Sequence, residues 1–154
     1  MADPREVLRD YIRAVAHVGF IVQDLKQAVA NACRVYGLDE GEVSIQPPFG
    51  EEALTRFAFF TVGNLEFELI EPCSDHFRKL LLGMPSGGAG INHVAWAVDD
   101  IENAVQILQD QGITPGHVTP DGIVQIGEKK MVYLDPATTG GLVIELIQYP
   151  SGIR

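Results

Sequence analysis

The segment His17-Val-Gly-Phe-Ile-Val-Gln-Asp-Leu25 returns later in the chain as His93-Val-Ala-Trp-Ala-Val-Asp-Asp-Ile101. A second pair of segments repeats in the same order, Phe67-Glu-Leu-Ile-Glu71 and Ile144-Glu-Leu-Ile-Gln148. The histidines of the first pair are 76 positions apart (93 − 17), and the glutamates that stand second in the other pair are 77 apart (145 − 68). Self-similarity at a fixed period is the signature of a repeated structural unit. The sequence therefore predicts two copies of one module.

The first copy is expected to combine a central helix with several strands. An apolar stripe at helical spacing follows the capping residue Asp24 and stops at Gly37. Gly63-Asn64 suits a tight hairpin turn. We expect helices over 24–37 and 75–82, and strands over 14–22, 43–46, 54–62 and 65–70. The stripe consists of Leu25, Ala28, Val29, Ala32 and Val35.

The second copy follows a segment rich in Gly and Pro over 85–90, which is the predicted linker. Asp99 or Asp100 is expected to cap a helix that ends near Gly112. Strands are expected over 91–98, near Val118, over 131–134 and over 142–147. At the start of the chain, residues 3–13 predict a short helix with Asp3 as N-cap and Pro4 at its first position.

Each copy contributes one histidine and one glutamate from apolar strands: His17 and Glu68, then His93 and Glu145. Side chains alternate along a strand, so each histidine shares its face with a small residue two positions on, which leaves open space. A single histidine in an apolar strand is usually a core residue. A buried glutamate is rarer, because leaving its carboxylate unpaired costs several kcal/mol. Two imidazoles and two carboxylates at matching places suit a divalent ion such as Zn, Co, Ni, Mn or Fe. We therefore expect a metal site.

Composition and charge exclude several classes of function. Hydrophobic residues make up 46% and charged residues 21% of the 154 residues, as in ordinary globular proteins. No apolar run approaches the roughly 20 residues that span a bilayer. The formal net charge of −10 repels nucleic acid and anionic membranes, although a small anionic substrate stays possible. The polar first residues predict that the protein is not secreted, and Cys33 and Cys73 predict two free thiols in a cytoplasmic protein.

From about residue 14 to residue 149 the chain resembles the vicinal oxygen chelate superfamily, which includes glyoxalases, methylmalonyl-CoA epimerases, ring-cleaving dioxygenases and antibiotic-resistance proteins. The resemblance implies an α+β fold of two βαβββ modules whose curled mixed sheets surround one metal ion. It implies one domain over 1–154, with a helical extension over 1–13 and modules over 14–84 and 90–149. The four positions that match the metal ligands are His17, Glu68, His93 and Glu145.

Within the superfamily, the second copy is most similar to the methylmalonyl-CoA epimerase family. The matching stretches are Gly90–Ile101, Leu134-Asp-Pro136 and Gly140–Pro150, and Gly63–Pro72 in the first copy also fits. The resemblance implies an isomerase in which Glu145 is one catalytic base, Glu68 is a ligand or the second base, and the histidines are fixed ligands. Some epimerases carry a further glutamate on the strand before the hairpin, where this chain has Thr55 or Arg56.

Two alternatives stay open from the sequence. Glyoxalase I, a lactoylglutathione lyase, shares the ligand types but has a Phe-Tyr pair in the first helix, where this chain has Asn31–Val35. Other superfamily members bind a ligand without turnover, usually without the full ligand set. Ring-cleaving dioxygenases, which use three ligands, fit less well. The expected partner is thus an acyl-CoA, a glutathione thioester or a hemithioacetal, and the superfamily also implies a homodimer.

Residues outside the repeated segments have simpler interpretations. His76 and His117 are expected on the surface. The aromatic cluster Phe57, Phe59 and Phe60 is expected in the core or an interface. Basic residues that could contact a carboxylate or CoA phosphates, but that more simply form a charged surface, are Arg56, Arg78, Lys79, Lys129 and Lys130.

Overall fold

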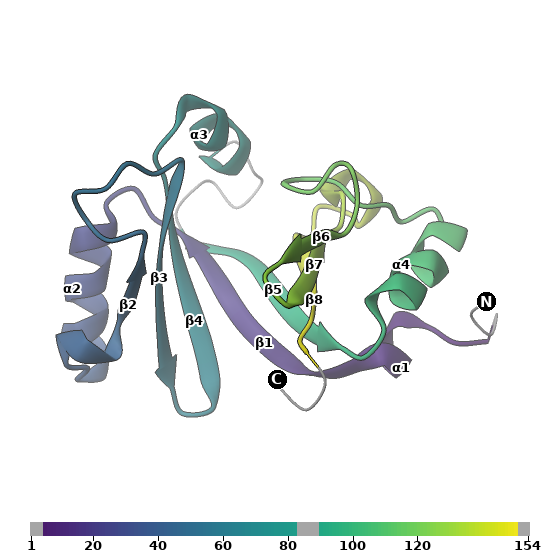
Figure 1. Ribbon diagram of the computed structural model, residues 1–154, viewed down its shortest axis with the longest axis horizontal. Coiled ribbons are helices and arrows are strands. Elements are labelled where there is room, and N and C mark those ends of the chain that lie inside the picture. The colour runs from purple at the N-terminus through teal and green to yellow at the C-terminus, as the bar shows by residue number, and fades with distance from the viewer. Residues whose placement is uncertain (1–4, 83–89, 151–154) are drawn as a thin grey trace. The chain divides into compact units, whose positions relative to one another are not determined.

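The computed structural model describes residues 5–82 and 90–150, which fold as two compact units. The central unit spans residues 17–92, and the terminal unit combines residues 1–16 with residues 93–154. Each unit contains a four-stranded mixed sheet, and the helices α2 and α4 belong to different units (Figure 1). Asp3, Pro4 and most of the predicted linker over 85–90 lie outside the described residues. Within the described ranges, no helix has both the length and the apolarity to cross a membrane.

The sheet of the central unit has the strand order β2-β3-β4-β1. Strand β1 runs parallel to β4, whereas β3 is antiparallel to both β2 and β4. The Gly63–Asn64 hairpin is confirmed, and Gly63 has the positive φ of 64° that such a turn requires. The elements are β1 (Ile12–Ile21), α2 (Leu25–Tyr36), the 3₁₀ helix η1 (Glu40–Glu42), β2 (Ser44–Gln46), β3 (Thr55–Val62), β4 (Leu65–Pro72) and α3 (Asp75–Leu82).

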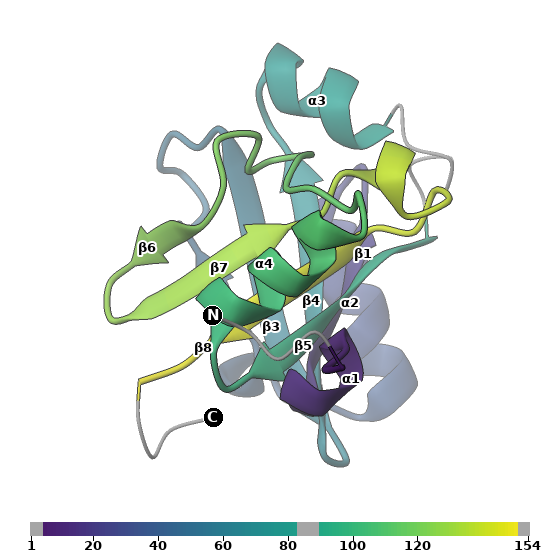
Figure 2. The same ribbon diagram turned by 90° about the vertical axis from the view of Figure 1, so that its right-hand side faces the viewer.

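The terminal unit repeats this plan with the strand order β5-β8-β7-β6. Strand β5 is parallel to β8, and β7 is antiparallel to β8 and β6. Helix α4 crosses this sheet on one face, as Figure 2 shows from the side of that helix. The elements are α1 (Leu8–Tyr11), β5 (Gly90–Val98), α4 (Ile101–Asp110), β6 (Val124–Ile126), β7 (Lys129–Tyr133), the 3₁₀ helix η2 (Pro136–Thr138) and β8 (Ile144–Gln148).

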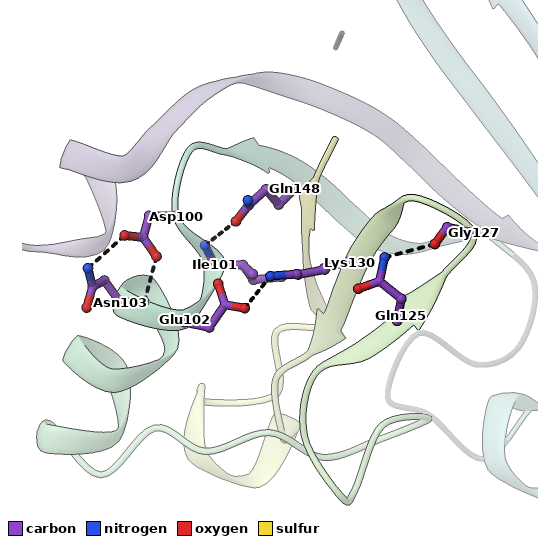
Figure 3. A network of polar contacts seen from close by, with 8 residues as sticks. All are labelled: Asp100, Ile101, Glu102, Asn103, Gln125, Gly127, Lys130 and Gln148. Atoms are coloured by element: carbon purple, nitrogen blue, oxygen red, sulfur yellow. Dashed lines mark hydrogen bonds and ion pairs between the residues drawn. The ribbon is translucent and has the colours of Figure 1, made fainter. Parts of the chain in front are cut away.

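The helix starts repeat at the level of single hydrogen bonds. Asp24 accepts from the backbone N–H of Gln27 at 3.0 Å, and Asp100 accepts from that of Asn103 at 3.1 Å. The first backbone N–H group of each of these helices also has an acceptor, a side chain near the end of β4 for α2 and of β8 for α4. Glu71 accepts from Leu25 N–H at 2.6 Å, and Gln148 accepts from Ile101 N–H at 2.8 Å (Figure 3). The duplication therefore extends from sequence to the bonds that join each helix to its sheet.

Each unit packs its helix against its sheet through a separate apolar core. In the terminal unit, Ile101, Ala104, Val105 and Leu108 of α4 pack with Val132 of β7, Leu146 of β8 and Leu134, which directly follows β7. In the central unit, Leu25 and the partly buried alanines of α2 pack with Ala58, Phe60 and Leu69. Close packing of this kind fixes the strands that carry the predicted site residues. Phe60 is in the core as predicted, whereas Phe57 and Phe59 are only partly buried.

Three details of the predicted elements are wrong. No strand forms near Val118, because residues 116–119 make a tight turn in which Thr119 N–H donates to Gly116 O at 2.9 Å. The strand of this region is β6, further along the chain. The described part of the first helix is only α1, because β1 already begins at Ile12. Val35 does not belong to the buried stripe, since it is 66% exposed.

The two aspartates before α4 allow a direct test of the cap. Asp100→Ala is expected to lower the free energy of unfolding by about 1 kcal/mol, because the first turn of α4 loses its side-chain acceptor. Asp99 only pairs with Arg13 at 3.2 Å, both largely exposed, so Asp99→Ala should cost at most a few tenths of a kcal/mol. Urea unfolding of both variants measures the difference. Equal losses would contradict the assignment of Asp100 as the cap.

Candidate metal centre

The central unit brings His17 and Glu68 together on adjacent strands. His17 lies on β1, and Glu68 lies on the parallel strand β4, opposite Gly19. Because Gly19 is two residues beyond His17, both polar side chains lie on the same face of the sheet. His17 Nε2 is 3.6 Å from Glu68 Oε2, and the residues are 4% and 7% exposed. Gly19, the small residue that shares this face, stands directly opposite Glu68.

The terminal unit contains the equivalent pair with the same register. His93 lies on β5, and Glu145 lies on β8 opposite Ala95, again two residues beyond the histidine. His93 Nε2 is 3.1 Å from Glu145 Oε2, and the residues are 1% and 4% exposed. Both pairs use the same ring nitrogen and the same diagonal placement on two parallel strands. In each unit the histidine and the glutamate therefore lie close together on one face of the sheet.

The spacing in both pairs suits two ligands of one metal ion. Nitrogen and oxygen ligands that each lie about 2.1 Å from an ion, at angles between about 90° and 110°, are about 3.0–3.4 Å apart. The measured 3.1 Å falls in this interval, and 3.6 Å needs an approach of a few tenths of an ångström. Buried carboxylates need a cationic partner, which an ion supplies. The described residues thus contain buried imidazole and carboxylate groups that could bind a metal.

Tyr133 is a site residue that the sequence analysis missed. It lies on β7 opposite Glu145, and its buried hydroxyl is 3.3 Å from His93 Nε2. Its ring meets the His93 ring edge-on, with 5.2 Å between the centroids. The signal in the sequence was its place in a predicted strand, but only the antiparallel register shows that it faces the His–Glu pair.

His117 also differs from its expected place on the surface. It is partly buried, and its ring contacts Tyr133 edge-on with the centroids 5.4 Å apart. His117 lies within the 116–119 turn and has a positive φ of 58°, which is unusual for a residue other than glycine. Burial lowers the pKa of His117 to about 4, and the nearby His93 lowers it further while Asp135 opposes the shift. The imidazole is therefore neutral at pH 7.

The His117 imidazole should make stability depend on pH. Its folded-state pKa of about 4 lies below the unfolded value near 6.5, so protonation favours unfolding. The contribution of the neutral His117 imidazole to the free energy of unfolding is fully present above pH 6.5 and is lost as pH falls toward 4. Because the ring is only partly buried, solvent screens part of this effect. Between these pH values the free energy of unfolding of wild type should fall by about 1–2 kcal/mol more than that of His117→Gln. Denaturant unfolding of chelator-treated protein at several pH values measures this, and parallel pH profiles would contradict it.

Two of the five basic residues considered as anion contacts, Arg56 and Lys130, make structural contacts instead. Arg56 Nε donates to Pro47 O at 3.0 Å, and a second bond joins its guanidinium to Glu51 O. Lys130 pairs with Glu102 at 2.6 Å on the exposed side of the terminal unit (Figure 3). A surface hollow on α3 is lined by Asp75, His76, Arg78 and Lys79. His76 is exposed there, as predicted.

Comparison with known proteins agrees with the resemblance noted in the sequence. Residues 16–133 match the model of the glyoxalase/bleomycin resistance protein/dioxygenase superfamily. The mitochondrial methylmalonyl-CoA epimerase of Dictyostelium discoideum is 30% identical over 84% of this chain and 75% of its own length. The 2-epi-5-epi-valiolone epimerase of an Actinomyces species is 32% identical over 90% of this chain and 81% of its own.

A solved structure shows the same fold. The crystal structure of methylmalonyl-CoA epimerase from Mycobacterium tuberculosis aligns with a TM-score of 0.73 and 20% identity, over 96% of this chain and 95% of the other. The eight strands and four α-helices of the described residues thus form the glyoxalase-like α+β fold that the sequence predicted. By its family model, its relatives and its fold, the chain belongs to the glyoxalase/bleomycin resistance protein/dioxygenase superfamily.

Proposed function

We propose that the protein is a metal-dependent epimerase that removes a proton from a carbon next to a carbonyl group and returns it on the other face. Methylmalonyl-CoA is the first candidate substrate. The observation that carries the proposal is the pair of buried His–Glu couples, which occupy equivalent strand positions and have the spacing of metal ligands. The epimerase relatives support the same class of reaction.

The proposed metal ligands are His17, Glu68, His93 and Glu145, all bound to one divalent ion (Co, Zn, Ni, Mn or Fe). Two protein ligands alone make an incomplete site, whereas two pairs from a duplicated module supply the usual number. The bound ion would act as a Lewis acid that stabilises negative charge developing on substrate oxygens. In each unit a small residue, Gly19 or Ala95, stands opposite the glutamate.

Proton transfer is assigned to the carboxylates of the chain. Glu145 is proposed as a general base that takes the proton from the α-carbon, and Glu68 as a ligand or the base on the opposite face. His17 and His93 stay fixed, because each lies in a strand interior and is at most 4% exposed. Arg56 stands in the region where some epimerases carry a further glutamate, and its guanidinium is bonded to the backbone. Because β3 contains no glutamate, we assign the second base to Glu68.

A second candidate substrate comes from the valiolone epimerase relative. That relative is 32% identical to this chain, which supports 2-epi-5-epi-valiolone as a candidate beside acyl-CoA thioesters. The chemistry at the site would be the same, since both substrates carry an acidic proton next to a carbonyl. A glyoxalase I-like lyase acting on a hemithioacetal, and a member that binds a ligand without turnover, are the further alternatives.

Proton exchange over a small substrate panel tests the proposal. Metal-loaded protein in D₂O is incubated with methylmalonyl-CoA, 2-epi-5-epi-valiolone or the hemithioacetal of methylglyoxal and glutathione, and deuterium uptake is followed by NMR. We expect metal-dependent exchange at the α-carbon of methylmalonyl-CoA. Exchange with the cyclitol alone would transfer the assignment to that substrate. Absence of exchange with all three, despite bound metal, would contradict an epimerase and favour a ligand-binding protein.

Two further expectations stay predictions: a homodimer, which light scattering can test, and a cytoplasmic location.

A further inference from the structure

The Tyr133 hydroxyl and the Glu145 carboxylate both lie close to the same nitrogen atom of His93. His93 Nε2 is 3.1 Å from Glu145 Oε2 and 3.3 Å from Tyr133 Oη. These three side chains come from β5, β8 and β7 of the terminal unit, and all three residues are buried. Buried tyrosine hydroxyls almost always have a hydrogen-bond partner, because desolvating the group without one is unfavourable. The phenol is therefore placed where the chemistry of this His–Glu pair takes place.

The duplicated module supplies an internal comparison for this hydroxyl. In the terminal unit Tyr133 of β7 stands opposite Glu145, and in the central unit Phe59 of β3 stands opposite Glu68. The same strand position thus carries an aromatic ring in both modules, but only one ring has a hydroxyl. The central unit holds a phenylalanine at the equivalent position, so Tyr133→Phe removes the hydroxyl while keeping a ring that the duplicated module already uses.

The backbone around Tyr133 is fixed by the 116–119 turn. Tyr133 N–H donates to Thr119 Oγ1 at 2.8 Å, and Gly116 N–H donates to Tyr133 O at 3.0 Å. A Cβ at Gly116 would lie 2.5 Å from Asp135 Cβ, so this close approach requires glycine. The His117 ring contacts one edge of the Tyr133 ring. A donor fixed in this way needs little reorganisation when charge develops beside it.

Metal binding would change the partner of the hydroxyl. With an ion bound, His93 Nε2 would neither donate nor accept a hydrogen bond, and the Tyr133 O–H could be donated to a substrate oxygen at the same site. In the proposed reaction the α-C–H bond breaks, the proton moves to Glu145, and the electron pair moves toward the carbonyl oxygen. A neutral donor binds the resulting enolate oxygen more strongly than the carbonyl oxygen.

We propose that Tyr133 is a further catalytic residue, whose hydroxyl donates a hydrogen bond to the enolate oxygen and keeps its own proton throughout. This inference rests on the proposed function. It assigns to one module a donor that the other module lacks, and it explains why the two His–Glu pairs differ in their aromatic neighbour.

The test compares binding of a charged mimic with binding of a neutral analogue. A nitronate analogue of the acyl-CoA resembles the planar enolate, and the saturated thioester resembles the ground state. In metal-loaded Tyr133→Phe we expect the nitronate to bind about tenfold to hundredfold more weakly than in wild type, with unchanged thioester affinity and metal content. The exchange rate at the α-carbon should fall by a similar factor. Tyr36→Phe, which removes a hydroxyl from a 47% exposed tyrosine, is the matched control and should leave all four quantities unchanged.

The outcomes separate this inference from the proposed function. If wild type prefers the nitronate and Tyr133→Phe prefers it equally, the role of Tyr133 is refuted and the epimerase proposal stands. If wild type shows no preference for the nitronate and no proton exchange, both proposals are refuted. A loss of metal from Tyr133→Phe would make the hydroxyl part of the metal site and would overturn its assignment as a substrate contact.

Discussion

Glu145→Gln is expected to slow exchange of the substrate α-proton with solvent by about 10²–10⁴-fold, because an amide cannot accept the proton as a general base. The amide oxygen can still approach a metal ion, so much of the metal should remain bound. Glu145 is 4% exposed and has the same volume as glutamine, so the fold should tolerate the change. Elemental analysis of the purified variant and deuterium uptake by NMR measure the two effects separately.

The control for this variant lies in the same unit. Glu102→Gln changes a carboxylate that pairs with Lys130 at 2.6 Å on an exposed face, outside the proposed site. Its exchange rate and metal content should match wild type. Exchange at the wild-type rate in Glu145→Gln would show that another group removes the proton, and Glu68→Gln would then be the next variant to measure.

His93→Ala is expected to have the largest effect on stability and metal binding together. His93 is 1% exposed, and its removal leaves the Glu145 carboxylate buried without its nearest basic partner. Removing one partner of a buried pair costs about 3–5 kcal/mol, and losing a direct ligand should weaken metal binding by at least about a hundredfold. Thermal unfolding with and without added Co²⁺ or Zn²⁺ measures both effects.

A second variant keeps this prediction testable if His93→Ala does not fold. His93→Gln retains a polar side chain of similar length, so it should fold while still losing most of the metal affinity. His76→Ala is the control, since His76 is an exposed residue of α3 and should change neither quantity. Metal-dependent stabilisation of His93→Gln equal to that of wild type would contradict the assignment of His93 as a ligand.

The repeated segments were sufficient to predict the parts of the fold that depend on local pattern. The hairpin at Gly63–Asn64 and the bounds of α3 were correct, because turn residues and helical spacing act over a few neighbours. Both His–Glu pairs could be inferred as well. In a repeated unit, the same two-residue alternation places both members of a pair on one face, and the parallel strands then bring them together.

The sequence could not predict the surroundings of the second pair. Whether Tyr133 faces Glu145 depends on the register of β7 against β8, which the intervening turn and η2 determine. The sequence analysis expected a strand near Val118, but the 116–119 turn is fixed by contacts with β7 that are distant in sequence. The same turn carries His117 toward Tyr133 and away from its expected surface position.

If the two His–Glu pairs bind one metal ion together, as proposed, the number of tightly bound divalent ions per chain distinguishes this single site from two separate ones. Metal-free protein is titrated with Co²⁺ by calorimetry, alongside His17→Ala and His93→Gln. We predict one ion per chain in wild type, and loss of tight binding in both variants, because each module would supply half of the proposed ligands. Two ions per wild-type chain, with one retained in each variant, would show two independent sites and contradict this account.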